Sequence, residues 1–411
     1  MAKNINNEVF DESTRLKLSI FGDCFEEWFP VFLHSKYVDK IVVFDFFAGS
    51  GTDAEGTPGS PLVLVKHARG EDCKYCKAAK KDIHFIFNER LKRKSETLSK
   101  NVAGFFDQCR HENSCEACTY TYKIEQNDFK TLFDRPDIQE VLNDKKTGKF
   151  VLLDQYGFKE IDDSIFSRLT AYPKTDFVFF VSSSNIKRFK EQMCVRKYLK
   201  TESIKFDDTK PNECHRVIAE YFRRQVKGEY FIHHFSIKKG SNYWGLIFGT
   251  GHSLGMEKFL KTCWKHDCLA GESNFNINND FEEDSLFFDP KTSSKKALVS
   301  KEIEALVCSG EISDNISGLM YAMKRGCEPK VFTETIKRLE KCGRVVRIGN
   351  LNYSSSNIHN LKNKQYRIRV LEYSSTQVVT WHMKKGGLIK YLNLWLSGGG
   401  FQRLFLSSLS T

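Results

Sequence analysis

The sequence predicts an α/β protein, in which a doubly wound, mostly parallel sheet is followed by a small C-terminal domain. Short apolar runs rich in β-branched and aromatic residues alternate with longer helical spacers, which is typical of such sheets. Several of these runs end in an acidic residue, and the first is followed by a glycine-rich turn. The 411 residues are enough for one catalytic-sized domain and a smaller module.

Net charge, the length of the apolar runs and the cysteine count indicate the partners and the cellular compartment of the protein. The formal net charge of +11 favours polyanionic partners, and the longest apolar runs, such as residues 177–181, are too short to cross a bilayer. The N-terminus lacks the apolar segment of a secretory signal, so we expect a cytoplasmic protein with no membrane association. In that compartment the 13 cysteines are expected to be thiols or metal ligands.

Residues 40–44 (KIVVF) predict the first buried strand, and a turn with candidate cofactor-binding residues follows it: Asp45, Phe47, Gly49 and Gly51. A phosphate-binding P-loop is excluded because no Gly-Lys-Ser/Thr follows the glycines. A dinucleotide turn matches formally, as GxGxxA over residues 49–54. An acid at the strand end favours S-adenosylmethionine, since a carboxylate attracts an ammonium group and repels a pyrophosphate.

The next two predicted strands also end in acids. Residues 83–89 end in Glu89, which is suited to binding both ribose hydroxyls, although it lies 40 residues past Gly49 where a Rossmann acid lies about 20 past. Residues 120–129 form the third strand, with Asp128 placed to accept from an adenine amino group and Phe129 to pack on the ring. Each acid, taken alone, is equally compatible with a solvated strand end.

Residues 149–154 predict a fourth strand, with the candidate catalytic residue Asp154 at its end and the second candidate, Tyr156, two residues later. A carboxylate and a ring at this place can hold and stack a base amine. Amino-group methyltransferases usually carry proline after the first residue, where this chain has Gln155, and a simple tight turn is the alternative. A fifth strand at 176–181 and a hairpin at 230–237 and 243–248 would complete a class I methyltransferase sheet within residues 1–273.

Together these segments resemble the three-Cys-motif partner proteins, a family of bacterial and phage proteins with a methyltransferase-like domain. The resemblance spans roughly residues 10–370 and rests on these segments: 16–28, DFFAGSG at 45–51, GSPL at 59–62, LDQYG at 153–157, FGTGHSLGMEK at 248–258, Trp264 and Asp267. It implies S-adenosylmethionine binding and a neighbouring protein with three cysteines, of a radical-S-adenosylmethionine-like kind.

Two C-x-x-C pairs lie in what we expect to be a cysteine-rich insertion at about residues 67–119. The pairs are Cys73 with Cys76 and Cys115 with Cys118. Each pair can present two thiolates from one turn, so together they predict a structural zinc site. Unligated thiols, a redox pair or an iron–sulfur cluster are the alternatives, and Cys109 and His111 lie close by.

After a predicted linker at 274–299, residues 300–370 predict three helices and two strands, the order of a winged helix. Residues 324–369 contain twelve Lys and Arg against three Glu, a local net charge of +9. The candidate nucleic-acid contacts are Lys330, Lys337, Arg338, Lys341, Arg347 and Arg367. A protein-binding module is the alternative, and residues 371–411 remain unassigned.

These features predict an S-adenosylmethionine-dependent methyltransferase acting on RNA or DNA, with a base amino group as acceptor. The alternative is a non-catalytic subunit with the same fold, which works with the three-cysteine protein in nucleic-acid processing or defence against phage. The glutamine at position 155 favours this alternative. A nicotinamide-dependent enzyme is a third hypothesis, because the glycine turn matches a dinucleotide motif formally.

Overall fold

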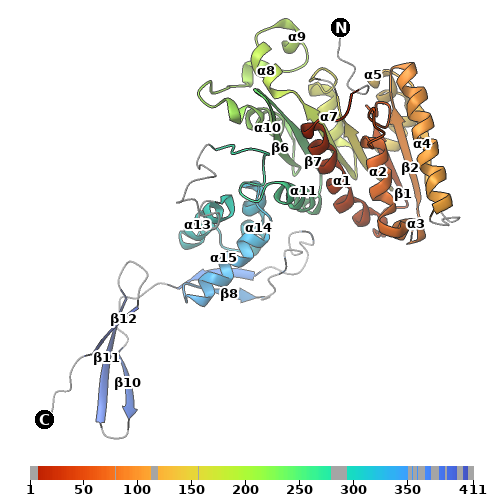
Figure 1. Cartoon of the computed structure of the whole chain (residues 1–411). Helices are drawn as coiled ribbons and strands as arrows, with labels where there is room; N and C mark the ends of the chain where they lie inside the picture. Colours follow the sequence, from red (N-terminus) through yellow and green to blue (C-terminus); the bar gives the residue numbers. More distant parts are fainter. Residues whose placement is uncertain are drawn as a thin grey trace.

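The structure is a computed structural model (Figure 1). It describes residues 8–78, 80–112, 119–155, 157–278, 294–349, 354, 359 and 366–371, and the backbone of three further C-terminal strands. No helix within these ranges is long and apolar enough to span a bilayer.

A seven-stranded sheet forms the centre of the larger domain, in the order β3-β2-β1-β4-β5-β7-β6. All strands are parallel except β7, which pairs antiparallel with both β5 and β6. The predicted Rossmann-like sheet, including its closing hairpin, is therefore confirmed. The strands are β1 (Lys40–Asp45), β2 (Asp82–Asn88), β3 (Thr121–Glu125), β4 (Thr147–Leu153), β5 (Thr175–Val181), β6 (Phe231–Lys239) and β7 (Asn242–Thr250).

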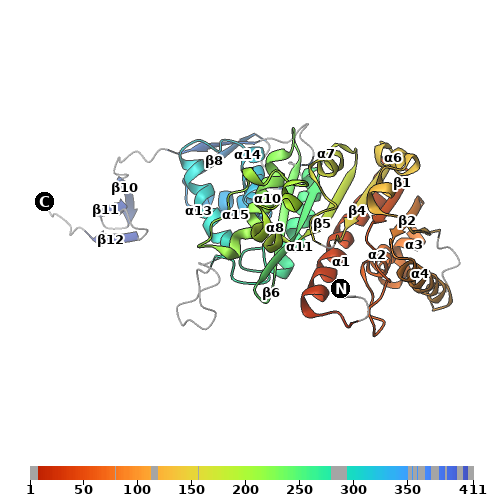
Figure 2. The ribbon, with the colours of Figure 1, turned by 90° about the horizontal axis from the view of Figure 1, so that it is seen from above.

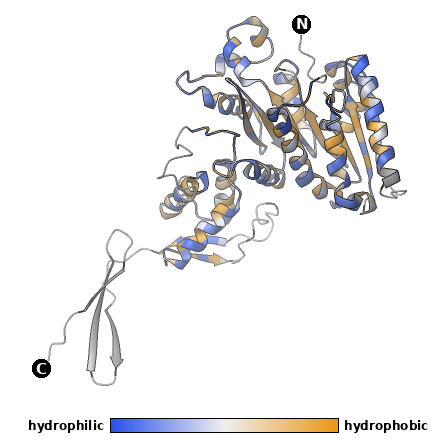
Figure 3. Cartoon of the chain, in the orientation of Figure 1, coloured by the Kyte–Doolittle hydropathy of each residue, from blue (hydrophilic) through white to orange (hydrophobic). Residues whose placement is uncertain are grey.

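Helices cover both faces of this sheet (Figure 1, Figure 2). Side chains of β1 alternate between two apolar cores, with Ile41 and Val43 in one and Val42 and Phe44 in the other. The strands are mostly orange in Figure 3, as expected for strands buried on both faces. The first core is covered by α1 (Glu12–Leu33), α2 (Ser60–Arg69), α3 (Lys74–Ala78), α4 (Lys92–Glu112) and α11 (Ser253–His266). The second is covered by α5 (Phe129–Phe133), α6 (Pro136–Asn143), α7 (Asp163–Ala171), α8 (Ser183–Phe189), α9 (Met193–Arg196) and α10 (Cys214–Gln225).

Helix α1 is anchored to the sheet at several points along its length. Asp11 caps it by accepting a hydrogen bond from the backbone N–H of Thr14 at 2.9 Å. Phe25 and Trp28 pack on Phe150 of β4, and Trp28 Nε1 donates to Asp176 of β5 at 2.8 Å. These contacts fix which side chains of the first helical turns lie at the carboxyl edge of the sheet.

The predicted insertion at 67–119 is not separate from the sheet. Strand β2 and helix α4 lie within it and belong to the α/β layers. Between α2 and β2 the described additions are a 3-10 turn (Glu71–Cys73) and the short helix α3. The backbone of 113–118 and the side chains of Cys109 and His111 lie outside the described residues.

The C-terminal module contains three helices and an antiparallel strand pair in the predicted order. They are α13 (Lys295–Cys308), α14 (Asn315–Lys324), α15 (Lys330–Lys341), β8 (Val345–Gly349) and β9 (Tyr366–Val370). The module thus begins before residue 300. Its core includes Met256, Leu260 and Trp264 of α11, whose opposite side packs on the sheet. Helix α11 therefore belongs to both domains.

The segments flanking this module differ from the predictions. Residues 274–278 do not form a plain linker, because Asn274 exchanges hydrogen bonds with the backbone of Lys238 in β6. In the unassigned tail, β10 (Val379–Lys384), β11 (Gly387–Trp395) and β12 (Phe401–Phe405) form an antiparallel sheet.

Replacing Gly249 by alanine is expected to destabilise the protein by roughly 1–3 kcal/mol. A Cβ there would lie 2.1 Å from Cζ of Phe177, its partner across β5 and β7, so the packed rings must shift. Urea unfolding measures the change. As a control, Gly104→Ala in α4 has open space around the new methyl group and should stabilise the helix by up to about 1 kcal/mol. Equal stability of Gly249→Ala and the parent chain would contradict this packing.

Candidate cofactor site

The loops that follow β1, β2, β3 and β4 converge at one edge of the sheet. Strand β1 pairs with β2 on one side and β4 on the other, so the connections that follow β1 and β4 run to opposite sides of the sheet. This divergence leaves a crevice between the loops at the carboxyl ends of the strands. The loops are joined by backbone hydrogen bonds: Ala48 N donates to Asn88 O at 2.9 Å, and Glu89 N donates to Glu125 O at 3.1 Å. The residues predicted to bind the cofactor lie on these loops.

The glycine turn has the backbone geometry that a close approach to a ligand requires. Gly49 and Gly51 adopt φ angles of 62° and 83°, which favour glycine. A Cβ on Gly51 would also lie 3.1 Å from Leu98 of α4. From the same helix Asn101 Nδ2 donates to Ser50 O at 2.8 Å, so the turn is held in place before any ligand binds.

Asp45 holds the glycine turn in place through hydrogen bonds. Its side chain is fully buried, and its two oxygens accept from Phe47 N at 3.1 Å and from Ser60 Oγ at 2.6 Å. Burial raises the pKa of Asp45 to about 7, and the nearby charge of Asp154 adds to this rise. A cofactor ammonium group would therefore meet this carboxyl through Ser60 or a water molecule, not directly.

Glu89 is better placed for a direct contact. It is half-buried, and its Oε1 accepts from Leu91 N at 2.7 Å. Its second oxygen forms no hydrogen bond with another side chain or backbone group in the described ranges. This oxygen can accept from a ribose hydroxyl, which fits the role predicted for Glu89.

Asn88 is a positioning residue that the sequence reasoning missed. Its side chain is buried, its Nδ2 donates to Phe46 O and Asn127 O at 3.1 Å each, and its Oδ1 accepts from Asn127 N at 3.0 Å. It therefore joins the loops after β1, β2 and β3. An amide side chain at the end of an apolar strand, directly before an acid, was the available signal.

The predicted adenine contacts differ from expectation. Asp128 is exposed and caps α5 by accepting from Lys130 N at 3.1 Å. Phe129 is buried, with Phe46 and Phe47 rings at 5.3 and 5.1 Å between centroids, so its ring cannot also cover an adenine. Phe47 is the half-buried aromatic ring at this corner.

Asp154 is not a free carboxylate. Lys17 of α1 donates to both of its oxygens, at 2.8 and 2.6 Å, and each side chain of the pair is about 15–17% exposed. The Lys17 ammonium also lies 4.7 Å from the ring centroid of Phe180 in β5. This pair could not be predicted from local sequence patterns, because 137 residues separate its members. Tyr156 lies outside the described residues.

Gln155, which replaces the expected proline, folds the loop back on itself. It is buried, and its Oε1 accepts from the backbone N–H groups of Glu160 at 2.9 Å and Ile161 at 3.4 Å. Gly157 O then accepts from Ser182 N at 3.0 Å, which joins the loop to the end of β5. A side-chain amide thus organises the turn at the position where amino-group methyltransferases usually carry a proline.

Other predicted site residues are placed as follows. Cys73, at the end of the 3-10 turn, and Cys76, in α3, are both buried, whereas Cys115 and Cys118 lie outside the described residues. Within the described ranges no group of three potential metal ligands occurs. His252 caps α11 by accepting from Leu254 N at 3.1 Å, which is a structural role.

The basic residues of the C-terminal module divide into two groups. Exposed residues of α15 recur at helical spacing and form one stripe: Lys330, Glu334, Lys337, Arg338 and Lys341. Arg367 is also exposed, on β9. Arg347, in contrast, has a side chain only 9% exposed and donates to Glu340 at 2.8 Å. The structure therefore gives Arg347 an internal role instead of the predicted contact with nucleic acid.

Comparison with known proteins gives a fold-level likeness only. No family model and no curated protein matches the chain. Similar solved structures include Trm1 from Pyrococcus horikoshii with S-adenosyl-L-methionine (13% identity, TM-score 0.36, 62% of this chain and 60% of that one). The METTL16 MTase domain (12%, 0.31, 60% and 71%) and the O-methyltransferase TomG from Streptomyces achromogenes (11%, 0.29, 58% and 89%) are others. The chain spans only about 60% of the length of Trm1.

Asp45 should make the folded protein less stable as the pH rises. The unfolded chain releases this proton near pH 4, whereas the folded chain keeps it until about pH 7, so stability falls between these values. Asp45→Asn removes this contribution. Relative to the parent chain, the variant should gain roughly 2–4 kcal/mol between about pH 4 and pH 7.5.

Urea unfolding of both proteins across this range measures the effect. The pKa of Asp176 is also raised by burial, to about 6, but Asp176 is present in both proteins and cancels in the comparison. Parallel stability profiles for the two proteins would show that Asp45 ionises normally in the folded chain.

Proposed function

We propose that this chain is an S-adenosylmethionine-dependent methyltransferase of the three-Cys-motif partner family, acting on a base amino group in nucleic acid. One observation carries the proposal. A pre-formed glycine turn, an acid at the end of β2 with an oxygen available, and Asp154 at the end of β4 meet at the switch point of a doubly wound sheet.

Different residues of the crevice have different roles in binding the cofactor. Gly49 and Gly51 allow the backbone to approach a ligand closely, Glu89 would accept from the ribose through its second oxygen, and Asp45 holds the turn in its binding shape. When bound, S-adenosylmethionine supplies an electrophilic methyl group. The residues present fit this cofactor, and Phe47, the half-buried ring of this corner, would take the adenine contact predicted for Phe129.

Asp154 would accept an N–H of the acceptor amine and aim its lone pair at the methyl group. For this the amine must displace Lys17 from at least one carboxylate oxygen, because Lys17 contacts both. Binding of a polyanion supports that exchange, since a phosphate can take over the lysine ammonium. The basic stripe of α15 supports nucleic acid as the polyanion, as does the proposed winged-helix architecture of its module.

The second candidate is a non-catalytic subunit with the same fold. Two observations favour it: Asp154 is already neutralised by Lys17, and Gln155 stands where amino-group methyltransferases usually have proline. Such a subunit would act with the three-cysteine protein in nucleic-acid processing or defence against phage. In either case we propose a structural zinc ion bound by Cys73, Cys76, Cys115 and Cys118.

Calorimetric titration of S-adenosylmethionine tests the cofactor site. Glu89→Gln and Asp45→Asn should each weaken binding at least about ten-fold, the loss expected for one charge-assisted hydrogen bond or its supporting turn. Asp39→Asn is the matched control, because Asp39 is an exposed acid before β1 at the opposite edge of the sheet. Absence of binding to the folded parent chain would exclude the cofactor.

Transfer of labelled methyl groups then separates the two candidates. Asp154→Asn should abolish methylation of RNA or DNA while it leaves cofactor binding within about three-fold of the parent value. A complex with the three-cysteine protein that remains active with this variant would instead support the non-catalytic subunit.

The α15 stripe predicts a specific salt effect. Replacing Lys337 and Lys341 by alanine should weaken nucleic-acid binding and reduce the slope of log affinity against log salt by about two, one for each phosphate contact. Arg347→Ala should leave this slope unchanged and lower the stability instead, because it breaks a largely buried ion pair. Binding at several salt concentrations measures the slope, and an unchanged slope in the double variant would contradict a role for the stripe.

A further inference from the structure

A row of cations and aromatic rings crosses the sheet beside the candidate acceptor position. It begins with Lys17, whose ammonium lies 4.7 Å from the ring centroid of Phe180 in β5. Phe180 meets Trp244 of β7 edge to face at 5.9 Å, and Lys239 of β6 lies 5.6 Å from the Trp244 ring. Since β5, β7 and β6 are consecutive strands of the sheet, the row is continuous from Asp154 to the outer edge.

These side chains share one face of the sheet and remain partly accessible. Phe180 packs against the core beneath α1, and Trp244 alternates along β7 with Leu246 and Phe248 of that core. Phe180 and Trp244 are half-buried, and Lys239 is exposed. Their positions near the end of β5, the start of β7 and the end of β6 place the row at the carboxyl edge, where the cofactor loops also lie.

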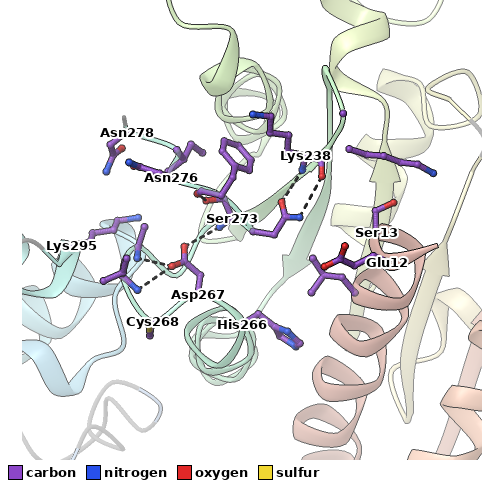
Figure 4. Close-up of a pocket in the computed structure, with 18 of the residues that line it drawn as sticks. Glu12, Ser13, Lys238, His266, Asp267, Cys268, Ser273, Asn276, Asn278 and Lys295 are labelled. Carbon is purple, nitrogen blue, oxygen red and sulfur yellow. Dashed lines mark hydrogen bonds between the residues drawn. The ribbon is translucent and has the colours of Figure 1, made fainter. Parts of the chain in front are cut away.

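The row leads into a pocket of about 620 Å³ between the first turns of α1, the tip of the β6–β7 hairpin and residues 266–278 (Figure 4). Lys238 enters this pocket from the hairpin, and its ammonium lies 6.0 Å from the ring of Phe275. Lys238 forms no ion pair with any described residue. Lys239, by contrast, pairs with Asp11 at the start of α1.

The acids in this pocket are few or already engaged. The carboxylate of Asp267 accepts from four backbone N–H groups, those of Leu269, Ala270, Glu272 and Ser273. Asp11 and Glu12 are exposed on the first turn of α1, so solvent screens them. Lysines interleaved with accessible rings are the arrangement that binds single strands, because cations contact phosphates and rings stack on bases.

We infer that the row of Lys17, Phe180, Trp244 and Lys239, with Lys238 and Phe275 in the adjoining pocket, binds a single-stranded segment of nucleic acid. This nucleic-acid track delivers an unpaired base to Asp154, since an amino group within a stacked duplex cannot reach the crevice. The inference rests on the proposed function and names its substrate class. It also gives Lys17 two partners, Asp154 in the free protein and a phosphate in the complex.

Fluorescence anisotropy with labelled oligonucleotides of about 12 residues tests the track, within the site sizes of single-strand binding folds. Single-stranded RNA or DNA should bind at least about ten-fold more tightly than the same sequence as a duplex. Trp244→Ala should weaken single-strand binding by roughly ten-fold, whereas Trp244→Phe, which keeps a ring, should weaken it by less than about three-fold. Replacing Lys238 and Lys239 by alanine should reduce the salt slope by about two.

A lysine and a ring at the opposite edge of the sheet provide the matched control, because Lys36 lies 5.3 Å from the exposed ring of Tyr37. Replacing both by alanine should leave binding unchanged. Cofactor titration should be unaffected in every track variant, so loss of oligonucleotide binding with intact cofactor binding isolates the track from the proposed function. Equal affinity for duplex, indifference to Trp244→Ala, or binding of poly-glutamate in preference to oligonucleotides would each overturn the inference.

Discussion

The hydrogen-bonded pairing of β1 with both β2 and β4 is the constraint on which the rest of the structure depends. It places β1 at the switch point of the sheet, where the connections leave in opposite directions. Beyond the strand ends, backbone N–H and C=O groups no longer bond to a neighbouring strand and need other hydrogen-bond partners. The side chains of Asp45 and Asn88 provide such partners for the loop after β1. These polar side chains thus hold the glycine turn in one conformation, which is formed before any ligand binds.

Helix α1 adds a second level of organisation, because it connects the acceptor side to the rest of the molecule. Asp23 and Glu27 on this helix pair with Lys265 and Lys258 of α11, at 2.7 and 2.8 Å. One rigid helix therefore holds Lys17 at the carboxyl edge and faces the helix that carries the C-terminal module. Helix α1 thus forms a continuous physical connection between Lys17 and the helix that carries the module.

The strands were predictable because each is a short apolar run, and runs of this kind have few alternatives inside a large core. The acids at the strand ends were also predictable, because each one lies at the end of a predicted strand. The sequence did not reveal which of them were free: Asp154 is paired by a lysine far away in the chain, and Phe129 is enclosed by rings from another loop. Such contacts depend on how helices cross the sheet, and local periodicity contains no information about that crossing. The range 67–119 given to the cysteine-rich insertion also contains the apolar strand predicted at 83–89, which is β2 of the sheet.

Because α11 packs on both domains, it affects how a truncated fragment of the chain would behave. Met256 and Leu260 pack into the module on one side of this helix, and Trp264 Nε1 donates to Gly326 O across the boundary at 3.0 Å. A fragment that ends before Lys295 would carry these side chains uncovered, as an apolar stripe at its surface. It would tend to self-associate, so the larger domain should be soluble and monodisperse only when the module is present, although every residue of the cofactor crevice lies in the larger domain.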